Sequence, residues 1–222
     1  MRIASFNIEK NGKSSPDIKQ GQVSTFIDNC CSNQFWDVDL VFICEMHSAQ
    51  LENYVLALSS MYPTYKTIGF HGGHSNGYIV MAKESQNIVV DSQGHLFALN
   101  RDLIAVEATG CSGYTGYVIL AHFKSGQNNI TKSQLQSCTG MGGNWVVTGD
   151  INYDYSKFGQ LGIAGSAHEC WNGQATQAKG GILDWVLAST SVTVTPLDIT
   201  GLAGTFDMSG PDHRPIVFDV TA

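Results

Sequence analysis

The stretch Trp145-Val146-Val147-Thr148-Gly149-Asp150-Ile151-Asn152 is a short apolar run that ends abruptly in polar residues. A continuous apolar run of this length is typical of a β-strand that is buried on both faces. The segment Leu40-Val41-Phe42-Ile43-Cys44 has the same character and runs into Glu45. Two such strands predict a layered protein with sheets, rather than helices, at its centre.

Many more strands and a few helices are expected, because short segments rich in β-branched and aromatic residues alternate with Gly, Asn, Asp and Ser. The expected strands are residues 3–7, 40–44, 67–69, 77–81, 88–90, 104–108, 117–121, 145–148, 185–187, 192–196 and 216–220. The expected helices are residues 20–30, 50–59 and 131–138, with a further short one at 154–160. This pattern predicts an α/β sandwich, in which two mixed sheets pack face to face with helices outside.

Length and composition limit the possibilities further. The chain has 222 residues, of which 43% are hydrophobic and 14% charged, and its net charge is −7. This length fits one domain covering residues 1–222, and no apolar run approaches the length of a membrane span. The acidic balance argues against capture of nucleic acid by net charge alone, but a bound divalent cation inverts the local charge of an acidic site.

The six cysteines do not form a recognisable metal or redox motif. They are Cys30, Cys31, Cys44, Cys111, Cys138 and Cys170. No C-x-x-C pair is present, which disfavours zinc, and an even count permits disulfides without assigning them. Cys44, inside an apolar strand, is expected to be a buried free thiol. No leader sequence is recognised, and the polar, charge-poor composition slightly favours a secreted mature form over a cytoplasmic protein.

Polar residues follow several of the expected strands, where a plain core strand would end in a turn former. They are Asn7, Glu45, His122, Asp150 and Asn152, together with Asp212 and His213 in the stretch Gly210-Pro211-Asp212-His213-Arg214-Pro215. Each of them alone has an ordinary explanation as a helix cap or turn residue. Because strand ends of such a sandwich meet at one edge, we expect the set to lie together.

This set suits attack on phosphorus. A hard cation such as Mg²⁺ prefers carboxylate oxygens and waters as ligands, and Glu45 is the best single candidate for it. Histidines can donate to a phosphate and transfer protons near neutral pH. Asp184 precedes an apolar strand and is a candidate for fixing the tautomer of His213.

The motifs Phe6-Asn7-Ile8-Glu9, Cys44-Glu45-Met46-His47, Ala121-His122, Gly149-Asp150-Ile151-Asn152, Leu183-Asp184-Trp185 and Pro211-Asp212-His213-Arg214-Pro215 occur in an order that resembles the endonuclease/exonuclease/phosphatase superfamily, which has the deoxyribonuclease I-like fold. The resemblance spans nearly the whole chain. It implies a four-layer α-β-β-α sandwich and phosphodiester hydrolysis with Mg²⁺, or with Mn²⁺ or Ca²⁺ in its place.

The resemblance also implies roles for individual residues. The expected metal ligands are Glu45, Asn7 and Asp212, with Glu9 as a candidate for a second metal. The expected catalytic residues are His122, Asp150, Asn152, Asp184 and His213. The expected contacts to the substrate phosphate are Arg101, Asn7 and Asn152.

The expected function is therefore a metal-dependent phosphodiesterase, in the first place a monomeric endonuclease acting on DNA. The segment from Ala175 to Trp185 is similar to the nuclease subunit of cytolethal distending toxins, which leaves a delivery partner open. A phosphoinositide phosphatase or sphingomyelinase-type phosphodiesterase is the alternative, although the chain has neither a basic head-group cluster nor a long apolar hairpin. A binding module that has lost catalysis is disfavoured, because no structural requirement preserves all of these polar residues.

Overall fold

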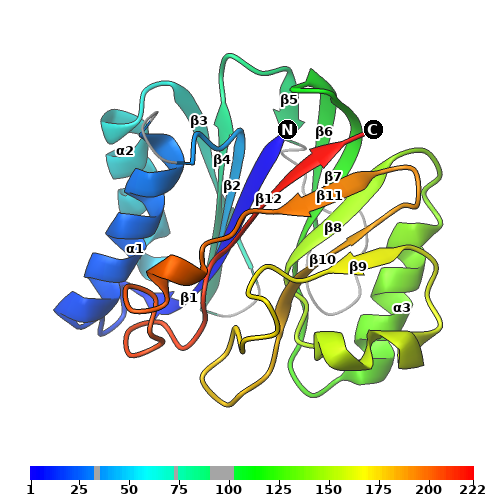
Figure 1. Ribbon diagram of the computed structural model, residues 1–222. Helices are drawn as coiled ribbons and strands as arrows, with labels where there is room; N and C mark the ends of the chain where they lie inside the picture. The colour runs from blue at the N-terminus through cyan, green and yellow to red at the C-terminus, as the bar shows by residue number, and fades with distance from the viewer. Residues whose placement is uncertain (33–35, 73–74, 91–102) are drawn as a thin grey trace.

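Two six-stranded β-sheets lie face to face at the centre of the molecule, and helices cover their outer sides (Figure 1). The computed structural model describes residues 1–32, 36–72, 75–90 and 103–222. The arrangement is the α-β-β-α sandwich expected from the sequence. None of the helices within the described ranges is long and apolar enough to cross a membrane.

Each sheet combines parallel and antiparallel pairs. The first sheet contains β1 (Arg2–Asn11), β2 (Leu40–His47), β3 (Tyr65–His71), β4 (Asn76–Lys83), β11 (Thr193–Pro196) and β12 (Ile216–Thr221), in the order β11-β12-β1-β2-β4-β3. The second contains β5 (Ile88–Val90), β6 (Ile104–Cys111), β7 (Tyr114–His122), β8 (Trp145–Asp150), β9 (Ser166–His168) and β10 (Asp184–Ala188), in the order β5-β6-β7-β8-β10-β9. The parallel pairs are β1 with β2 and β7 with β8, so the carboxyl ends of these pairs point the same way within each sheet.

Helices pack on the outer face of each sheet. The α-helices are α1 (Asp17–Cys31), α2 (Leu51–Met61) and α3 (Asn128–Thr139), and the short 3₁₀ helices are η1 (Ser48–Gln50), η2 (Tyr155–Leu161) and η3 (Thr200–Leu202). Phe26 of α1 packs edge-on against Phe6 of β1, with ring centroids 5.1 Å apart. Leu135 of α3 packs on the second sheet in a cluster with Ile119. Figure 1 shows α1 and α2 on one side of the sandwich and α3 on the other.

The alternation of side chains along each strand decides what faces the space between the sheets. On β7, Val118 and Leu120 belong to the core shared by the two sheets, whereas Ile119 and Ala121 pack with α3. Successive side chains of a strand point to opposite faces, so His122 lies on the same side as Leu120. By the same count Asp150 faces the other sheet with Val146 of β8.

Most of the expected elements are confirmed, and three details differ. Strand β9, of three residues, is too short to carry a recognisable pattern. The expected helix at 154–160 is the 3₁₀ helix η2, because the Asp154 side chain accepts a hydrogen bond from the Ser156 N–H and holds a tight first turn. Both β1 and β2 continue beyond Asn7 and Glu45, so these two residues do not end their strands as expected.

All six cysteines are buried and none forms a disulfide. The prediction that Cys44 is a buried free thiol is therefore confirmed. Burial raises the pKa of the Cys31 and Cys138 thiols to about 12, so neither is a reactive thiolate at neutral pH.

Gly149 is required where β7 and β8 approach each other just before His122 and Asp150. Its φ is +129°, and an added Cβ would lie 2.0 Å from the Ala121 carbonyl oxygen. We expect Gly149→Ala to lower the free energy of unfolding by about 3 kcal/mol, because backbone must move and the conformation is strained for alanine. Urea unfolding measures this change.

Gly21→Ala is the matched control, because Gly21 lies in α1 with no atom near the added Cβ. This change should raise stability by about 0.5–1 kcal/mol. Equal unfolding midpoints for the two variants would contradict the close approach at Gly149.

Candidate functional site

A cavity of about 340 Å³ opens at the carboxyl ends of the two parallel strand pairs. Its lining gathers most of the polar residues singled out in the sequence from six separate segments of the chain. The lining residues are Asn7, Glu9, Glu45, His122, Ser125, Asp150, Asn152, Gln177, Lys179, Leu183, Asp212 and His213. The structure thus brings together eight of the predicted site residues in the lining, and a ninth, Asp184, lies directly behind His213.

Backbone irregularities aim Glu45 at this cavity. The Phe42 side chain faces the second sheet, because its ring would lie 3.2 Å from a Cβ added at Gly149 of β8. In a regular strand Glu45, three residues further on, would point to the opposite face, away from the second sheet. Instead Glu45 has φ +60° and the pairing of β2 with β4 shifts register there, which indicates a β-bulge. As a result its carboxylate lies 3.0 Å from His122 of the opposite sheet.

A similar irregularity follows Asn7 on β1. The pairing of β1 with β2 shifts between Asn7 and Asn11, and Glu9 and Lys10 both have positive φ. The Asn7 side-chain oxygen accepts a hydrogen bond from the Glu9 N–H at 2.9 Å, and the side-chain nitrogen of Asn7 is directed toward Asp150. The bulge thereby fixes the orientation of the Asn7 amide.

The Asp150 carboxylate is the centre of the site. Only 1% of its surface is exposed. Its Oδ2 accepts hydrogen bonds from Asn7 Nδ2 at 3.0 Å and from Asn152 Nδ2 at 2.7 Å, and its Oδ1 accepts one from the Asn152 N–H at 2.9 Å. Asn152 also donates to the Phe123 carbonyl and has φ +51°. One buried carboxylate is therefore held by both sheets.

His213 and Asp184 form a buried pair beside Asp150. His213 Nδ1 donates to Asp184 Oδ2 at 2.8 Å, and His213 Nε2 lies 4.0 Å from Asp150 Oδ2. The Thr176 hydroxyl accepts from the backbone N–H groups of Leu183 and Asp184 and so fixes the start of β10. This geometry leaves Nε2 as the reactive end of His213.

His122 is almost fully buried between two carboxylates. Its Nε2 lies 3.0 Å from Glu45 Oε1 and 3.6 Å from Asp150 Oδ2. In this arrangement the imidazole links Glu45 to Asp150 across the two sheets.

The pKa values of Asp150 and His213 are both raised, for different physical reasons. Burial raises the pKa of Asp150 to about 6, and the nearby Asp184 carboxylate adds to this rise. Burial by itself lowers the pKa of His213, but the carboxylates of Asp184 and Asp150 outweigh it and raise this pKa to about 10. The site therefore holds an imidazolium and a carboxylate side by side at neutral pH.

Asp212 and Glu9 lie on the more open side of the cavity and are joined by a hydrogen bond. Glu9 Oε2 accepts from the Asp212 N–H at 3.2 Å and pairs with Lys19 Nζ at 3.2 Å. Glu9 thus already has a cation, which leaves it a weaker candidate for a second metal than the sequence suggested.

Sequence reasoning missed Gln177 and Lys179 as lining residues. Both lie in the loop before β10, far along the chain from the residues they approach. The resemblance of the segment from Ala175 to Trp185 drew attention to this loop, but it assigned neither residue a role, and no periodicity marks them. Arg101, a predicted phosphate contact, lies outside the described residues.

The oxygen-rich cavity fits a divalent cation. Asp150, Asp184 and His213 have ligand atoms within 4.8 Å of one another, so this group could hold a metal ion. Asp184 lies behind His213 and does not line the cavity, whereas Glu45 and Asp212 do, so these two carboxylates are the better candidate ligands.

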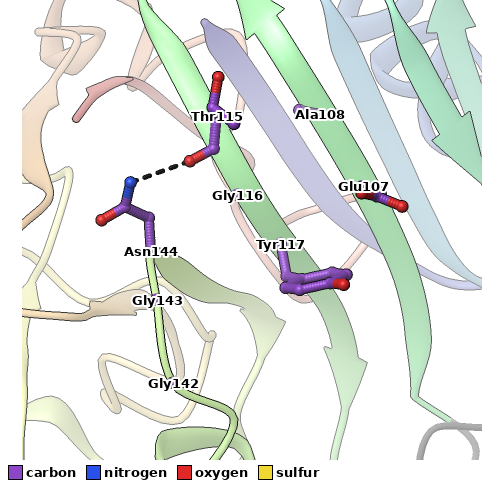
Figure 2. A pocket seen from close by; sticks show the side chains of 8 residues that line it. All are labelled: Glu107, Ala108, Thr115, Gly116, Tyr117, Gly142, Gly143 and Asn144. Carbon is purple, nitrogen blue, oxygen red and sulfur yellow. Dashed lines mark hydrogen bonds between the residues drawn. The ribbon is translucent and has the colours of Figure 1, made fainter.

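A second hollow, of about 250 Å³, lies near the opposite end of β7 (Figure 2). Glu107 and Tyr117 flank it on neighbouring strands, and Asn144 donates to the Thr115 carbonyl at 2.9 Å. The residues that line this hollow include one carboxylate and no imidazole. They cannot perform the acid-base chemistry that the first cavity supports.

Comparison with known proteins agrees with this geometry. A family model described as Endonuclease/Exonuclease/phosphatase family matches residues 4–205. The chain belongs to the endonuclease/exonuclease/phosphatase family. Enzymes of this family are hydrolases that act on phosphodiesters or phosphate esters, typically with a divalent metal ion.

Solved structures of this family share the fold at low sequence identity. A humanized TDP2 from D. rerio has a TM-score of 0.66 and 16% identity, covering 100% of this chain and 99% of that one. The human Nocturnin catalytic domain with a bound sulfate anion has a TM-score of 0.64 and 16% identity, covering 100% and 94%. A family protein from Bacteroides thetaiotaomicron has a TM-score of 0.61 and 12% identity, covering 99% and 97%. No curated protein matches the chain by sequence.

The His213–Asp184 pair has a measurable signature. Because the folded-state pKa of about 10 exceeds the ordinary value of 6.5, protonation of His213 stabilises the fold fully below pH 6.5, and this contribution is lost as the pH rises through 10. We expect NMR titration of the protein in EDTA to show one imidazole still protonated at pH 8. Asp184→Asn should return that imidazole toward its usual pKa, whereas seven neutral imidazoles at pH 8 in the unmodified protein would contradict the pairing.

Proposed function

We propose that the protein is a Mg²⁺-dependent phosphodiesterase that cleaves DNA as an endonuclease. The observation that carries this proposal is the convergence of Asp150, Asn7, Asn152 and the His213–Asp184 pair on one cavity that also contains Glu45 and Asp212. This set supplies a buried base, two amide donors, a charged imidazole and a cation site within reach of one phosphate.

Asp150 is the proposed base. Two side-chain amides hold its carboxylate, and its pKa of about 6 keeps it ionised at neutral pH while leaving it able to accept a proton from water. Asn7 donates one side-chain N–H to Asp150, so its other N–H is available to orient a phosphate. Asn152 instead uses both of its side-chain N–H groups, on Asp150 and on the Phe123 carbonyl, and so holds the base in place. The water would thus be placed by Asp150 and the phosphate by Asn7.

His213 is the proposed donor to the phosphate. Asp184 accepts a hydrogen bond from the Nδ1–H of His213 and stabilises the positive charge of the imidazolium, so Nε2–H can donate to a non-bridging oxygen on which negative charge develops. In this assignment Asp150 removes the proton from water, and His213 acts mainly by charge and hydrogen bonding. His122 is assigned to the leaving oxygen, which requires it to exchange its contact with Glu45 for one with substrate.

Mg²⁺ bound by Glu45 and Asp212 would neutralise the phosphate and assist departure of the leaving oxygen. The chain's own contribution is to direct these carboxylates at the cavity. Mn²⁺ or Ca²⁺ could replace Mg²⁺ at oxygen ligands of this kind.

DNA is the proposed substrate because the cavity is open at the surface and the fold is similar to that of D. rerio TDP2 complexed with single strand DNA product. In addition, Lys179 brings a cation to an otherwise acidic lining. A role as the nuclease subunit of a toxin, with a delivery partner, rests only on the resemblance of the segment before β10 and stays a prediction, as do secretion and a monomeric state.

A small phosphodiester or phosphate ester is the second candidate substrate. The net charge of −7 favours it, since a protein of this charge gains no long-range attraction toward a polyanion. Phosphoinositides and sphingomyelin belong to this class. The two candidates share the same catalytic groups and differ only in the surface around the cavity.

Nicking of supercoiled plasmid in the presence of Mg²⁺ tests the proposal. We expect EDTA, Glu45→Gln and His213→Ala each to reduce the rate by at least about 100-fold, because each removes a group that acts on the transition state. Circular dichroism should show that both variants remain folded.

Glu107→Gln is the matched control, because it makes the same type of change in the second hollow (Figure 2) and should nick at the unmodified rate. Nicking that survives in both Glu45→Gln and His213→Ala would refute the assigned site. A folded protein that hydrolyses bis(p-nitrophenyl) phosphate but does not nick plasmid would replace DNA with the small-diester alternative.

A further inference from the structure

Gln177 is a nearly buried amide at the wall of the cavity, with 8% of its surface exposed. Both ends of its side chain are engaged. Nε2 donates to Asp212 Oδ2 at 2.9 Å, and Oε1 accepts from the Lys179 backbone N–H at 2.8 Å. Such a two-ended arrangement leaves the amide one favourable orientation.

The backbone around Gln177 is joined to the segment that carries the catalytic pair. The Ala178 N–H donates to the Asp212 carbonyl at 2.8 Å, and the Arg214 N–H donates to the Thr176 carbonyl at 2.7 Å. Gln177 and His213 are themselves paired as an isolated β-bridge. Side chain and backbone therefore form one unit that holds Asp212 in place.

Asp212 needs such support because its side chain is 35% exposed and is the least enclosed of the proposed ligands. An exposed carboxylate samples several rotamers, and ordering it on cation binding costs free energy. The bond from Gln177 engages Oδ2, while Oδ1 lies 3.8 Å from His213 Nε2, on the side of the reactive groups. One oxygen is thus directed toward the catalytic pair before any cation arrives.

We propose that Gln177 is a positioning residue that pre-orients Asp212 for binding the divalent cation. This inference rests on the proposed function, because it requires a cation at Asp212. Residues that hydrogen-bond metal ligands typically change metal affinity or activity by about 10–100-fold when they are removed. The expected effect is therefore on the cation, and the reacting groups are affected only through it.

Gln177→Leu tests the inference, because leucine keeps a side chain of similar size and removes both hydrogen bonds. We expect the affinity for Mn²⁺, measured by electron paramagnetic resonance of free Mn²⁺ without substrate, to fall by about 10-fold. In nicking assays the Mg²⁺ concentration at half-maximal rate should rise by the same factor. The rate at saturating Mg²⁺ should change less than about threefold.

Gln174→Leu is the matched control. Gln174 lies in the same loop and bonds to the exposed end of Arg214 at 3.3 Å, away from Asp212. Its Mn²⁺ affinity should equal that of the unmodified protein. If Gln177→Leu does not fold, as judged by circular dichroism in EDTA, Gln177→Asn replaces it, because the shorter amide cannot reach both partners.

The outcomes separate this inference from the proposed function. If the unmodified protein binds Mn²⁺ and Gln177→Leu binds it equally well, Gln177 does not position Asp212 and the function proposal survives. A lower saturating rate with unchanged metal affinity also overturns the inference and assigns Gln177 to the substrate. If the unmodified protein binds no Mn²⁺ at millimolar concentration, the metal-dependent function and the inference are both wrong.

Discussion

The buried carboxylate of Asp150 is the constraint on which the rest of the site depends. A carboxylate with 1% exposure is tolerated only when hydrogen bonds and neighbouring charge replace its lost hydration. Asn7 from the first sheet and Asn152 from the second supply those bonds. The geometry of the site therefore depends on the packing of the two sheets, because a shift of either sheet would remove hydrogen-bond donors from the buried Asp150 carboxylate.

Unusual backbone conformations concentrate at the same place. Glu9, Glu45 and Asn152 all have φ between +47° and +60°, a region that costs a non-glycine residue about 1–3 kcal/mol. Two of them lie at register shifts in β1 and β2, where the strands resume their pairing on either side. The regular ladders thus hold in place the irregular residues that direct side chains into the cavity. A regular β2 would turn Glu45 away from the second sheet.

The cavity, like the chain as a whole, contains more acidic than basic side chains. The cavity gathers several carboxylates against His122, His213 and Lys179, and burial raises the pKa of Asp150 to about 6. A divalent cation is the ligand that would restore the balance, and it would also attract a phosphate that the acidic protein would otherwise repel. The network around Gln177 contributes to this balance, because it orders Asp212, the more exposed of the two carboxylates proposed to bind the cation.

The sequence by itself determined the layers and much of the site. Apolar strands such as Trp145–Asp150 and the polar residues after them predicted the sandwich, and the positions of His122 and Asp150 follow directly from the alternation of side chains along β7 and β8. The tertiary structure decided what alternation cannot predict. Glu45 faces the cavity through a bulge inside a longer strand, and Gln177 reaches Asp212 across 35 residues of chain. Likewise, the high pKa of His213 depends on three carboxylates, of which only Asp212 is its neighbour in sequence. Local pattern encodes which side of a strand a residue occupies, whereas hydrogen bonds and charges between distant segments exist only once the chain is folded.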